Sequence, residues 1–176
     1  MANPRAAILD NIYYLQQATV LLADMTPETF TYKNPPLYQN GVGPHLRHCM
    51  DHVELFLQGY ADGHVDYDQR PRRDLQQQDP VAMCLWIREL IEKLKNLQVE
   101  DLPRSLKVKM DCGSEMMDPW SGSTVFRELQ FLISHTVHHF ALIAMILRDQ
   151  GLPVSEGFGV APSTLKFAAE LPPCAP

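Results

Sequence analysis

Six of the seven histidines fall in two short stretches of the chain, and their spacing suits metal binding. His135 and His139 are four residues apart within the apolar segment 123–150, so on a helix their side chains share one face about 5–6 Å apart. Two imidazoles placed in this way can bind one cation, each through a ring nitrogen about 2.0–2.1 Å from zinc. Burying both without a partner would be costly. This segment is therefore predicted to carry a large part of a metal site.

The second group of histidines is spaced by three and four residues and so also lies on one helix face: His45, His48 and His52. A site of three neutral imidazoles leaves at least one coordination position open, which is typical of catalytic rather than structural metal. Helical spacing does not decide which of the three would join the pair from the later segment. His138 is rotated away from its neighbours by the helical period, and we expect it at the rim of the site.

Other common metal patterns are absent from the sequence. It contains no Glu-x-x-His, which argues against a di-iron carboxylate centre, and no His-Glu-x-x-His of the metalloprotease type. The cysteines are widely spaced and form neither a zinc ribbon nor a disulfide framework: Cys49, Cys84, Cys112 and Cys174. The acids nearest to the first histidine group, Asp51 and Glu54, are interpreted as surface residues rather than ligands.

Four amphipathic segments would have to position these histidines. Helical periodicity and Pro- or Ser-containing starts predict core helices at about 4–25, 44–61, 80–97 and 122–150. The last has an apolar stripe consisting of Phe126, Leu129, Ile133, Phe140, Ile143 and Leu147. Before it, apolar residues alternate with Lys107 and Lys109, a period of two that is compatible with a short β-hairpin closed by Met116. The predicted fold class is all-α, a four-helix bundle with this hairpin before its last long helix.

Composition limits the classes of function. With 176 residues and 45% apolar residues, the chain is predicted to form a single domain over 1–176, of which 152–176 is a C-terminal extension. A net charge of −6 and a pI near 5.6 argue against nucleic-acid binding. Polar residues interrupt the longest apolar segment, so no membrane span is expected. The first residues lack a signal-peptide pattern, and a cytoplasmic location is expected.

The chain resembles the DinB-like (YfiT-like) superfamily of metal-binding four-helix bundles. The residues that carry the resemblance are Val42-Gly43-Pro44-His45-Leu46-Arg47-His48 and His135-Thr136-Val137-His138-His139, and the likeness extends over about 1–151. The family pattern has one ligand histidine just inside the second helix and two more, four apart, in the last long helix. Carried over position by position, the implied metal ligands are His48, His135 and His139.

This resemblance also implies an activity and partners. It implies one divalent ion (zinc, nickel or iron), a homodimer, and use of the metal with low-molecular-weight thiols, as in thiol S-transferases. The partner would be a small-molecule thiol or electrophile. It would bind near Pro44 and the loop 30–43, with Tyr32 and Tyr38 as lining residues. The alternatives are a non-catalytic metal-binding or stress-response protein, and a structural bundle whose histidines are only hydrogen-bonded in the core.

Overall fold

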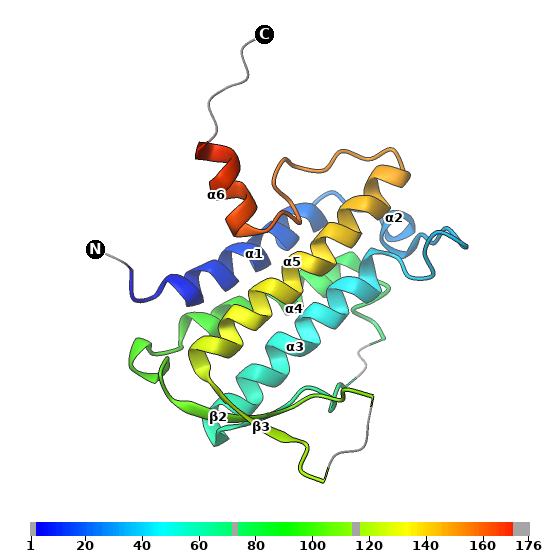
Figure 1. Cartoon of the computed structure of the whole chain (residues 1–176). Coiled ribbons are helices and arrows are strands. Elements are labelled where there is room, and N and C mark those ends of the chain that lie inside the picture. Colours follow the sequence, from blue (N-terminus) through cyan, green and yellow to red (C-terminus); the bar gives the residue numbers. More distant parts are fainter. Residues whose placement is uncertain (1–2, 72–73, 114–116, 171–176) are drawn as a thin grey trace.

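The structure is a computed structural model that describes residues 3–71, 74–113 and 117–170 (Figure 1). Its helices are α1 (Ala6–Leu22), α2 (Pro27–Thr31), α3 (Val42–Asp62), α4 (Pro80–Lys95), α5 (Val125–Asp149) and α6 (Pro162–Glu170), with a short 3-10 turn at Val99–Asp101. Its strands are β1 (His64–Asp66), β2 (Ser105–Lys109) and β3 (Trp120–Thr124).

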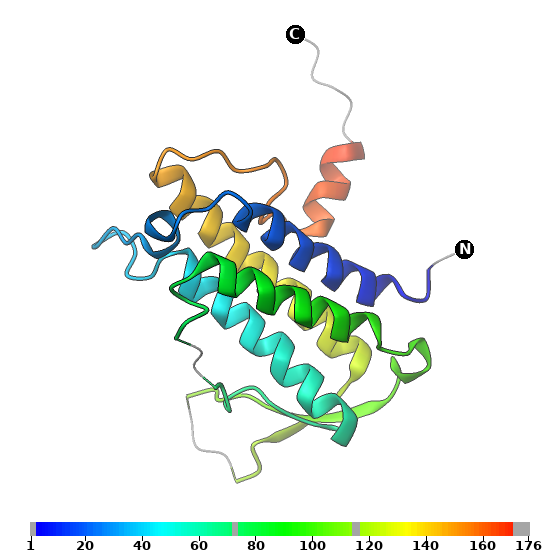
Figure 2. The same cartoon turned by 180° about the vertical axis from the view of Figure 1, so that it is seen from behind.

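The four long helices pack side by side around one apolar core (Figures 1 and 2). α1 contacts α4 and α5, and α3 contacts the same two helices. Each helix turns an apolar stripe inward, and burial of these stripes is the main source of stability. The largest fully buried side chains are Phe30, Phe56, Phe140, Ile8, Leu15, Leu46, Met50, Met83, Ile87, Leu90, Leu94 and Leu129. This core sets the relative position of α3 and α5, which carry the two histidine groups.

The predicted all-α fold class is wrong, because the described residues include a three-stranded mixed sheet in the order β1-β2-β3. β2 and β3 pair antiparallel, with Leu106 opposite Ser123, in the region where a hairpin was expected. β1 joins the other edge of β2 in parallel, with Val65 opposite Val108. The proposed closure of the hairpin at Met116 lies outside the described residues. The fold is therefore a mixed α/β arrangement, with the sheet at one end of α3 and α5.

Gly59 explains how α3 can lie so close to this sheet. A Cβ atom at this position would fall 2.1 Å from the backbone oxygen of His64, at the start of β1. Only glycine leaves room for that approach, although it lowers the intrinsic stability of a helix interior. Gly63 then ends α3 with φ of 77°, the left-handed conformation typical of a helix terminator.

α5 differs from the sequence expectation in two respects. Phe126, assigned to its buried stripe, is 44% exposed, whereas Val125 and Leu129 are buried. The helix is also long and apolar enough to cross a membrane by length and composition alone, with 44% of the relevant window buried in the structure. The core helix of a soluble protein meets the same criterion. Here α5 packs along α1 and α3.

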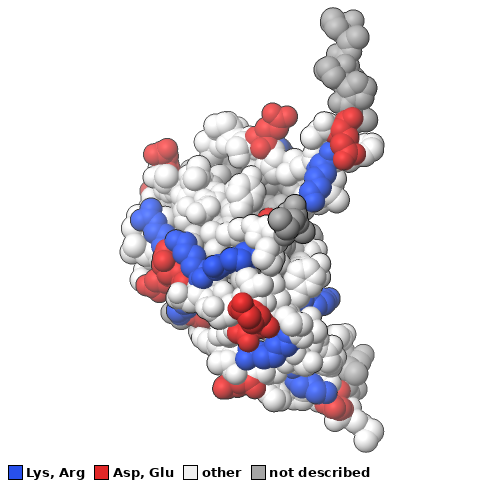
Figure 3. Space-filling model, turned by 90° about the vertical axis from the view of Figure 1, so that its left-hand side faces the viewer, with Lys and Arg blue, Asp and Glu red and all other residues white. Residues whose placement is uncertain are grey.

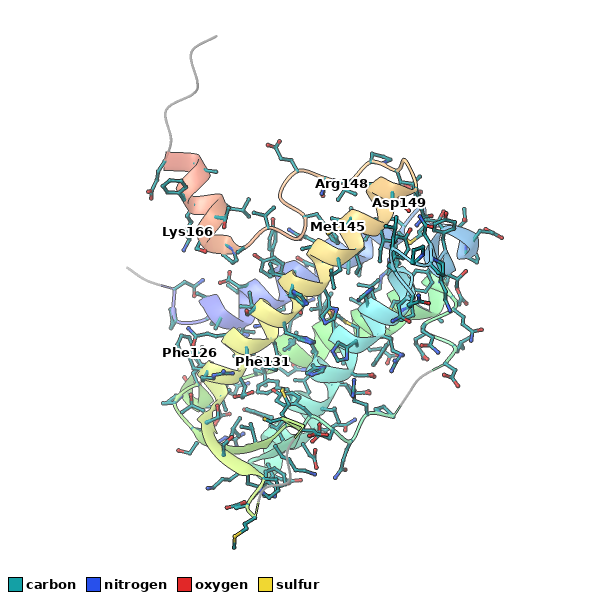
Figure 4. The ribbon with its side chains drawn as sticks, turned by 45° about the vertical axis from the view of Figure 1, so that its right-hand side comes forward. Phe126, Phe131, Met145, Arg148, Asp149 and Lys166 are labelled. Atoms are coloured by element: carbon teal, nitrogen blue, oxygen red, sulfur yellow. The ribbon has the colours of Figure 1, made fainter. Side chains whose placement is uncertain are left out.

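The segment after α5 returns to the core before it turns outward. Phe158 is buried and its ring stacks on Phe140 of α5 at 4.5 Å between centroids. α6 then projects away from the long helices, with Lys166 on its surface and no buried residue (Figure 4). Part of the predicted extension 152–176 thus forms a helix, Pro162–Glu170. Cys174 lies outside the described residues.

Candidate metal centre

The histidines lie in a groove between α3 and α5. Pro44 stands in the first turn of α3, and the three histidines that follow it point to α5 in successive turns. α5 begins at Val125, where the side chain of Thr124 accepts a hydrogen bond from the backbone N–H of Arg127. We call the histidine groove the set His45, His48, His52, His135 and His139.

Two pairs of ring nitrogens approach closely across the groove. His48 Nε2 lies 3.2 Å from His135 Nε2, and His45 Nδ1 lies 3.1 Å from His139 Nδ1. The ring of His52 is 4.2 Å from that of His135, measured between centroids. α3 and α5 therefore run in opposite directions here, because the earlier histidine on α3 faces the later one on α5.

Three of these side chains could hold a metal ion. His48, His52 and His135 each offer one ring nitrogen, and the three atoms lie within 4.8 Å of one another. Two nitrogens that share one zinc ion are at most about 4.2 Å apart, so the widest pair would close slightly on binding. Nδ1 of His52 lies 2.9 Å from the backbone oxygen of His48, which leaves Nε2 unprotonated when Nδ1 donates. That tautomer is the one a metal ligand requires.

The protonation state of the groove also fits a metal. Burial, followed by the charges of neighbouring histidines, lowers the pKa of His135 to about 2 and that of His48 to about 3. Burial and the neighbouring His45 lower the pKa of His139 to about 4. Neutral imidazoles are the form that ligates metals, so these side chains need not lose a proton to bind one at neutral pH.

One buried nitrogen in the groove has no partner. Nδ1 of His135 is buried and makes no hydrogen bond to any described residue. An unpaired buried polar atom costs free energy and calls for an explanation such as a water or an ion. The donor set of neutral imidazoles, together with this atom, fits zinc or another imidazole-preferring metal.

Aromatic residues fix two of the rings. Tyr67 stacks on His52 with 5.2 Å between ring centroids, and Phe131 stacks on His135 at 5.6 Å. The hydroxyl of Tyr67 donates to Oε2 of Glu128 at 2.8 Å. Figure 4 labels Phe131 on α5, on the turn before His135. These contacts hold the imidazole planes at one end of the groove.

Two clefts reach the histidine groove from opposite ends. The Pro44 cleft, of about 890 Å³, is lined by Pro27, Glu28, Thr31, Lys33, Asn40, Pro44, His45, Arg47, His48, Gln77, Gln78 and His139. The Arg70 cleft, of about 1020 Å³, is lined by His48, His52, Tyr67, Asp68, Arg70, Lys109, Met110, Asp111, Cys112, Gly113, Pro119, Phe131 and His135. His48 lines both clefts, so a ligand could reach its ring from either side. Acidic and basic side chains are interspersed on the face seen in Figure 3.

Several expectations about the surroundings need correction. Asp51 and Glu54 are buried rather than at the surface, and Arg47 pairs with Asp51 at 2.8 Å. Tyr32 and Tyr38 do not line the Pro44 cleft. Tyr38 instead donates a hydrogen bond to Asp149, at the end of α5 (Figure 4).

The structure brings together the three residues named by the family pattern, His48, His135 and His139. It also places a fourth histidine, His52, beside His135. His139 has its ring 4.8 Å from that of His48 and 4.7 Å from that of His135, measured between centroids. His52 is closer to His135, and sequence spacing had left it as one of three open choices. The exposed His138 contacts His139 at 5.1 Å between ring centroids.

No family model matches the chain. A protein of Rhizopus delemar described as FK506-binding protein 5 is 31% identical over 105 residues, which are 58% of this chain and 27% of that protein. The chain thus matches about a quarter of that relative's length. The similarity covers only one segment of that relative. The binding of FK506 that its name describes is therefore a statement about that protein and not about this chain.

Proposed function

We propose that this chain is a DinB-like protein that binds a divalent metal ion in the histidine groove and activates a low-molecular-weight thiol or water there. The observation that carries the proposal is the approach of His48, His52 and His135, whose ligand atoms lie within 4.8 Å of one another. A structural role for hydrogen-bonded histidines is disfavoured by the unpaired Nδ1 of His135.

The set of ligands implied by the family pattern and the close group in the structure share two histidines and differ in the third. His48 and His135 belong both to the set implied by the family pattern and to the close group in the structure. The third ligand is His139 in the first set and His52 in the second. Because the ring of His139 contacts the rings of both His48 and His135 edge to face, either third histidine supports the same function.

The chemistry would be that of an open metal site. A divalent ion held by neutral imidazoles lowers the pKa of a bound thiol or water, which yields a nucleophile at neutral pH. Tyr67 and Phe131 hold the rings of His52 and His135 and cover one side of the groove. The Arg70 cleft gives a small thiol or electrophile access to the same rings. A polar cleft of this size suits a metabolite better than a macromolecule.

The alternative is a metal-binding protein without catalysis, with a role in stress response or in holding a partner. The same histidines would serve, and the ion would be zinc, nickel or iron in either case. A homodimer and a cytoplasmic location stay predictions from the resemblance and the sequence. FK506 binding is not proposed, because the similarity to that relative covers 27% of its length.

Metal content tests the site. Wild type and the variants His48→Ala, His135→Ala, His52→Ala and His139→Ala are purified, stripped, reloaded with zinc and analysed for bound metal. We expect the first two variants to lose most of the zinc, and one of the other two to lose as much. His64→Ala is the control, since His64 lies in β1 and contacts Trp120 instead of the groove. Full zinc in His135→Ala would overturn the proposal.

Turnover separates the two functions. Metal-loaded protein is supplied with glutathione, cysteine or another cellular thiol and a chromogenic electrophile. We expect thiol consumption that disappears in His48→Ala and persists in His64→Ala. Stoichiometric zinc without turnover for any thiol or for a hydrolysable ester would favour the non-catalytic alternative.

A further inference from the structure

A third cleft lies on the α1 side of α5 and plays no part in the proposed function. It has a volume of about 770 Å³ and is enclosed by α1, α2 and the segment that follows α5 (Figures 1 and 2). No histidine lines it. α2 separates it from the Pro44 cleft, since Thr29 lines the third cleft and Thr31 lines the other. We call it the α1 cleft, and its apolar lining includes Tyr13, Val20, Leu21, Leu147, Leu152 and Phe158.

One face of α1 forms the floor of this cleft. Tyr13, Gln17 and Val20 follow one another at intervals of four and three residues, so they share a face of the helix. The side chains of Tyr13 and Val20 are 53% and 76% exposed. The floor therefore offers apolar surface that the described part of the chain leaves uncovered.

The opposite wall is a closely packed turn. Phe158 is buried, and its backbone N–H donates a hydrogen bond to the backbone oxygen of Ser155 at 3.1 Å. A Cβ atom at Gly159 would lie 2.5 Å from the backbone nitrogen of Ala141, so this segment rests directly on α5. Gly159 itself has a φ of 74°, a conformation that glycine adopts without strain. The cleft is thus formed by the chain itself before any ligand binds, as small-molecule sites usually are.

The charged side chains of the cleft all have the same sign. Asp24 lines it from the end of α1 and Glu156 from the opposite wall, and no lysine or arginine is part of the lining. Both acids are exposed, and neither forms an ion pair with a described residue. Arg148, in the last turn of α5 (Figure 4), does not line the cleft. Two carboxylates beside an apolar surface favour a ligand that is both cationic and apolar.

Gln17 adds an unused hydrogen-bond acceptor to the lining. Its Oε1 is buried and makes no hydrogen bond to a described residue, which costs free energy. When this amide turns toward a ligand in the cleft, Oε1 loses no hydrogen bond and gains a donor. A protonated amine offers such donors and is also attracted to the face of an aromatic ring such as that of Tyr13.

We propose that the α1 cleft binds a small organic cation, namely a protonated amine attached to an apolar body. The apolar body lies between Val20 and Phe158. The ammonium group donates to Gln17 and is attracted by Asp24 and Glu156. A cleft of this volume suits a ligand of metabolite size. The site uses no metal ligand, so the inference is independent of the proposed function.

Three probes of equal chain length test this inference. Metal-free wild type is titrated with n-octylamine, octan-1-ol and octanoate at pH 7.5 while its backbone amide NMR signals are recorded. The amine is protonated at this pH, as a lysine side chain is. We expect the amine to bind more tightly than the alcohol and octanoate to bind least, with shifts in α1 and in the segment after α5. Octanoate binding as tight as that of the amine, no binding of the amine, or shifts elsewhere would overturn the proposal.

Removal of the two carboxylates tests the role of charge. In Asp24→Asn/Glu156→Gln we expect the amine to bind about three- to tenfold more weakly and the alcohol to bind as before. The matched control is Asp10→Asn/Glu89→Gln, which removes the same net charge at exposed positions outside the cleft. This control should keep the wild-type affinity for the amine. Equal weakening in both double variants would mean that only net charge matters and would overturn the proposed site.

Two further variants test the acceptor and the floor. Gln17→Met removes the acceptor, so the amine and the alcohol should both bind more weakly, while stability in urea does not fall because Oε1 has no partner to lose. Val20→Arg brings a positive charge to an exposed position of the floor and should abolish amine binding. Unchanged amine binding in either variant would overturn the proposal.

The remaining outcomes distinguish this inference from its alternatives. A dimer in sedimentation that Val20→Arg dissociates and the amine leaves intact would assign the cleft to a second copy of the chain and overturn the proposal. Zinc content should be the same in wild type and in all of these variants, so loss of amine binding leaves the metal-binding function standing. Circular dichroism verifies that each variant is folded.

Discussion

Nη1 of Arg70 lies 3.0 Å from Nδ1 of His48, and this contact determines which nitrogen of His48 carries the proton. An arginine side chain can only donate hydrogen bonds, so Nδ1 must accept, and in the neutral ring the proton sits on Nε2. Nε2 is the atom that faces His135 at 3.2 Å. A metal bound through Nε2 would require the opposite tautomer. Metal binding and the Arg70 contact therefore exclude each other.

The first prediction is that Arg70→Ala binds zinc more tightly than wild type. The substitution removes a hydrogen bond worth about 0.5–1.5 kcal/mol in the metal-free state, together with a positive charge beside the ion. We expect an affinity gain of roughly two- to tenfold, measured by competition with a chromogenic chelator at pH 7.5. Arg88→Ala, an exposed change on α4, is the matched control and should leave the affinity as it is. A weaker site in Arg70→Ala would contradict the tautomer argument.

The second prediction concerns acid stability of the metal-free protein. The pKa values of His135 and His48, about 2 and about 3, lie below the ordinary histidine value, so the unfolded chain binds protons more readily than the folded one. The contribution of these two neutral histidines to the free energy of unfolding is fully present above about pH 6.5. It is lost as the pH falls from there toward the folded pKa values. The urea midpoint should therefore drop between pH 7.5 and pH 5.

Asp66 and Asp149, which accept side-chain hydrogen bonds, do not account for this window. Hydrogen bonds lower the pKa of Asp66 and Asp149 from 3.8, so their contribution is lost only at more acid pH. His135→Gln serves as the comparison, and its midpoint should depend less on pH between 7.5 and 5. An equal slope in wild type and variant would show that His135 is not held neutral by burial.

The third prediction concerns the hydrogen bond made by Tyr67, the residue whose ring stacks on His52. Tyr67→Phe removes the hydroxyl that donates to Oε2 of the buried Glu128 at 2.8 Å and leaves that oxygen without this donor. We expect a loss of about 1–3 kcal/mol in the free energy of unfolding, measured in urea. Tyr13→Phe is the control, because Tyr13 is 53% exposed and should change stability by less than about 0.5 kcal/mol. Equal stability of the two variants would contradict the assigned hydrogen bond.

The fourth prediction concerns the junction of α3 and β1. In Gly59→Ala the new methyl group would lie 2.1 Å from the backbone oxygen of His64, so helix and strand must move apart. We expect a loss of at least about 1–3 kcal/mol in the free energy of unfolding, despite the higher helix propensity of alanine. Gly122→Ala in β3 meets no atom within 4 Å and provides the control. A Gly59→Ala protein as stable as this control would mean that α3 does not approach β1 so closely.

The sequence predicted the long helices well, because their apolar positions recur with the helical period and their starts carry recognisable residues. α3 and α5, at Val42–Asp62 and Val125–Asp149, lie within a few residues of the predicted 44–61 and 122–150. The sheet was predicted only in part. β1 is three residues long and pairs with a strand beyond α4, so nothing in its local pattern marks it.

The histidine groove was also predictable only in part. Spacing of three and four residues placed the two histidine groups on helix faces, but a helix face does not reveal the axial offset of a neighbouring helix. That offset sets His52 opposite His135 and His45 opposite His139. Burial of Asp51 and Glu54 has the same origin, since the packing of α3 against its neighbours decides which flank of the stripe is covered.

The parallel pairing of β1 with β2 has a consequence for folding kinetics. Parallel strands cannot be joined by a tight turn, so the chain must complete α4 and its connections before β1 finds its partner. Contacts between distant segments slow folding, because the loop between them must be closed first. During synthesis on the ribosome, His45, His48 and His52 emerge long before His135 and His139. The groove is therefore assembled late, and a nascent chain cannot capture metal there until α5 has been made.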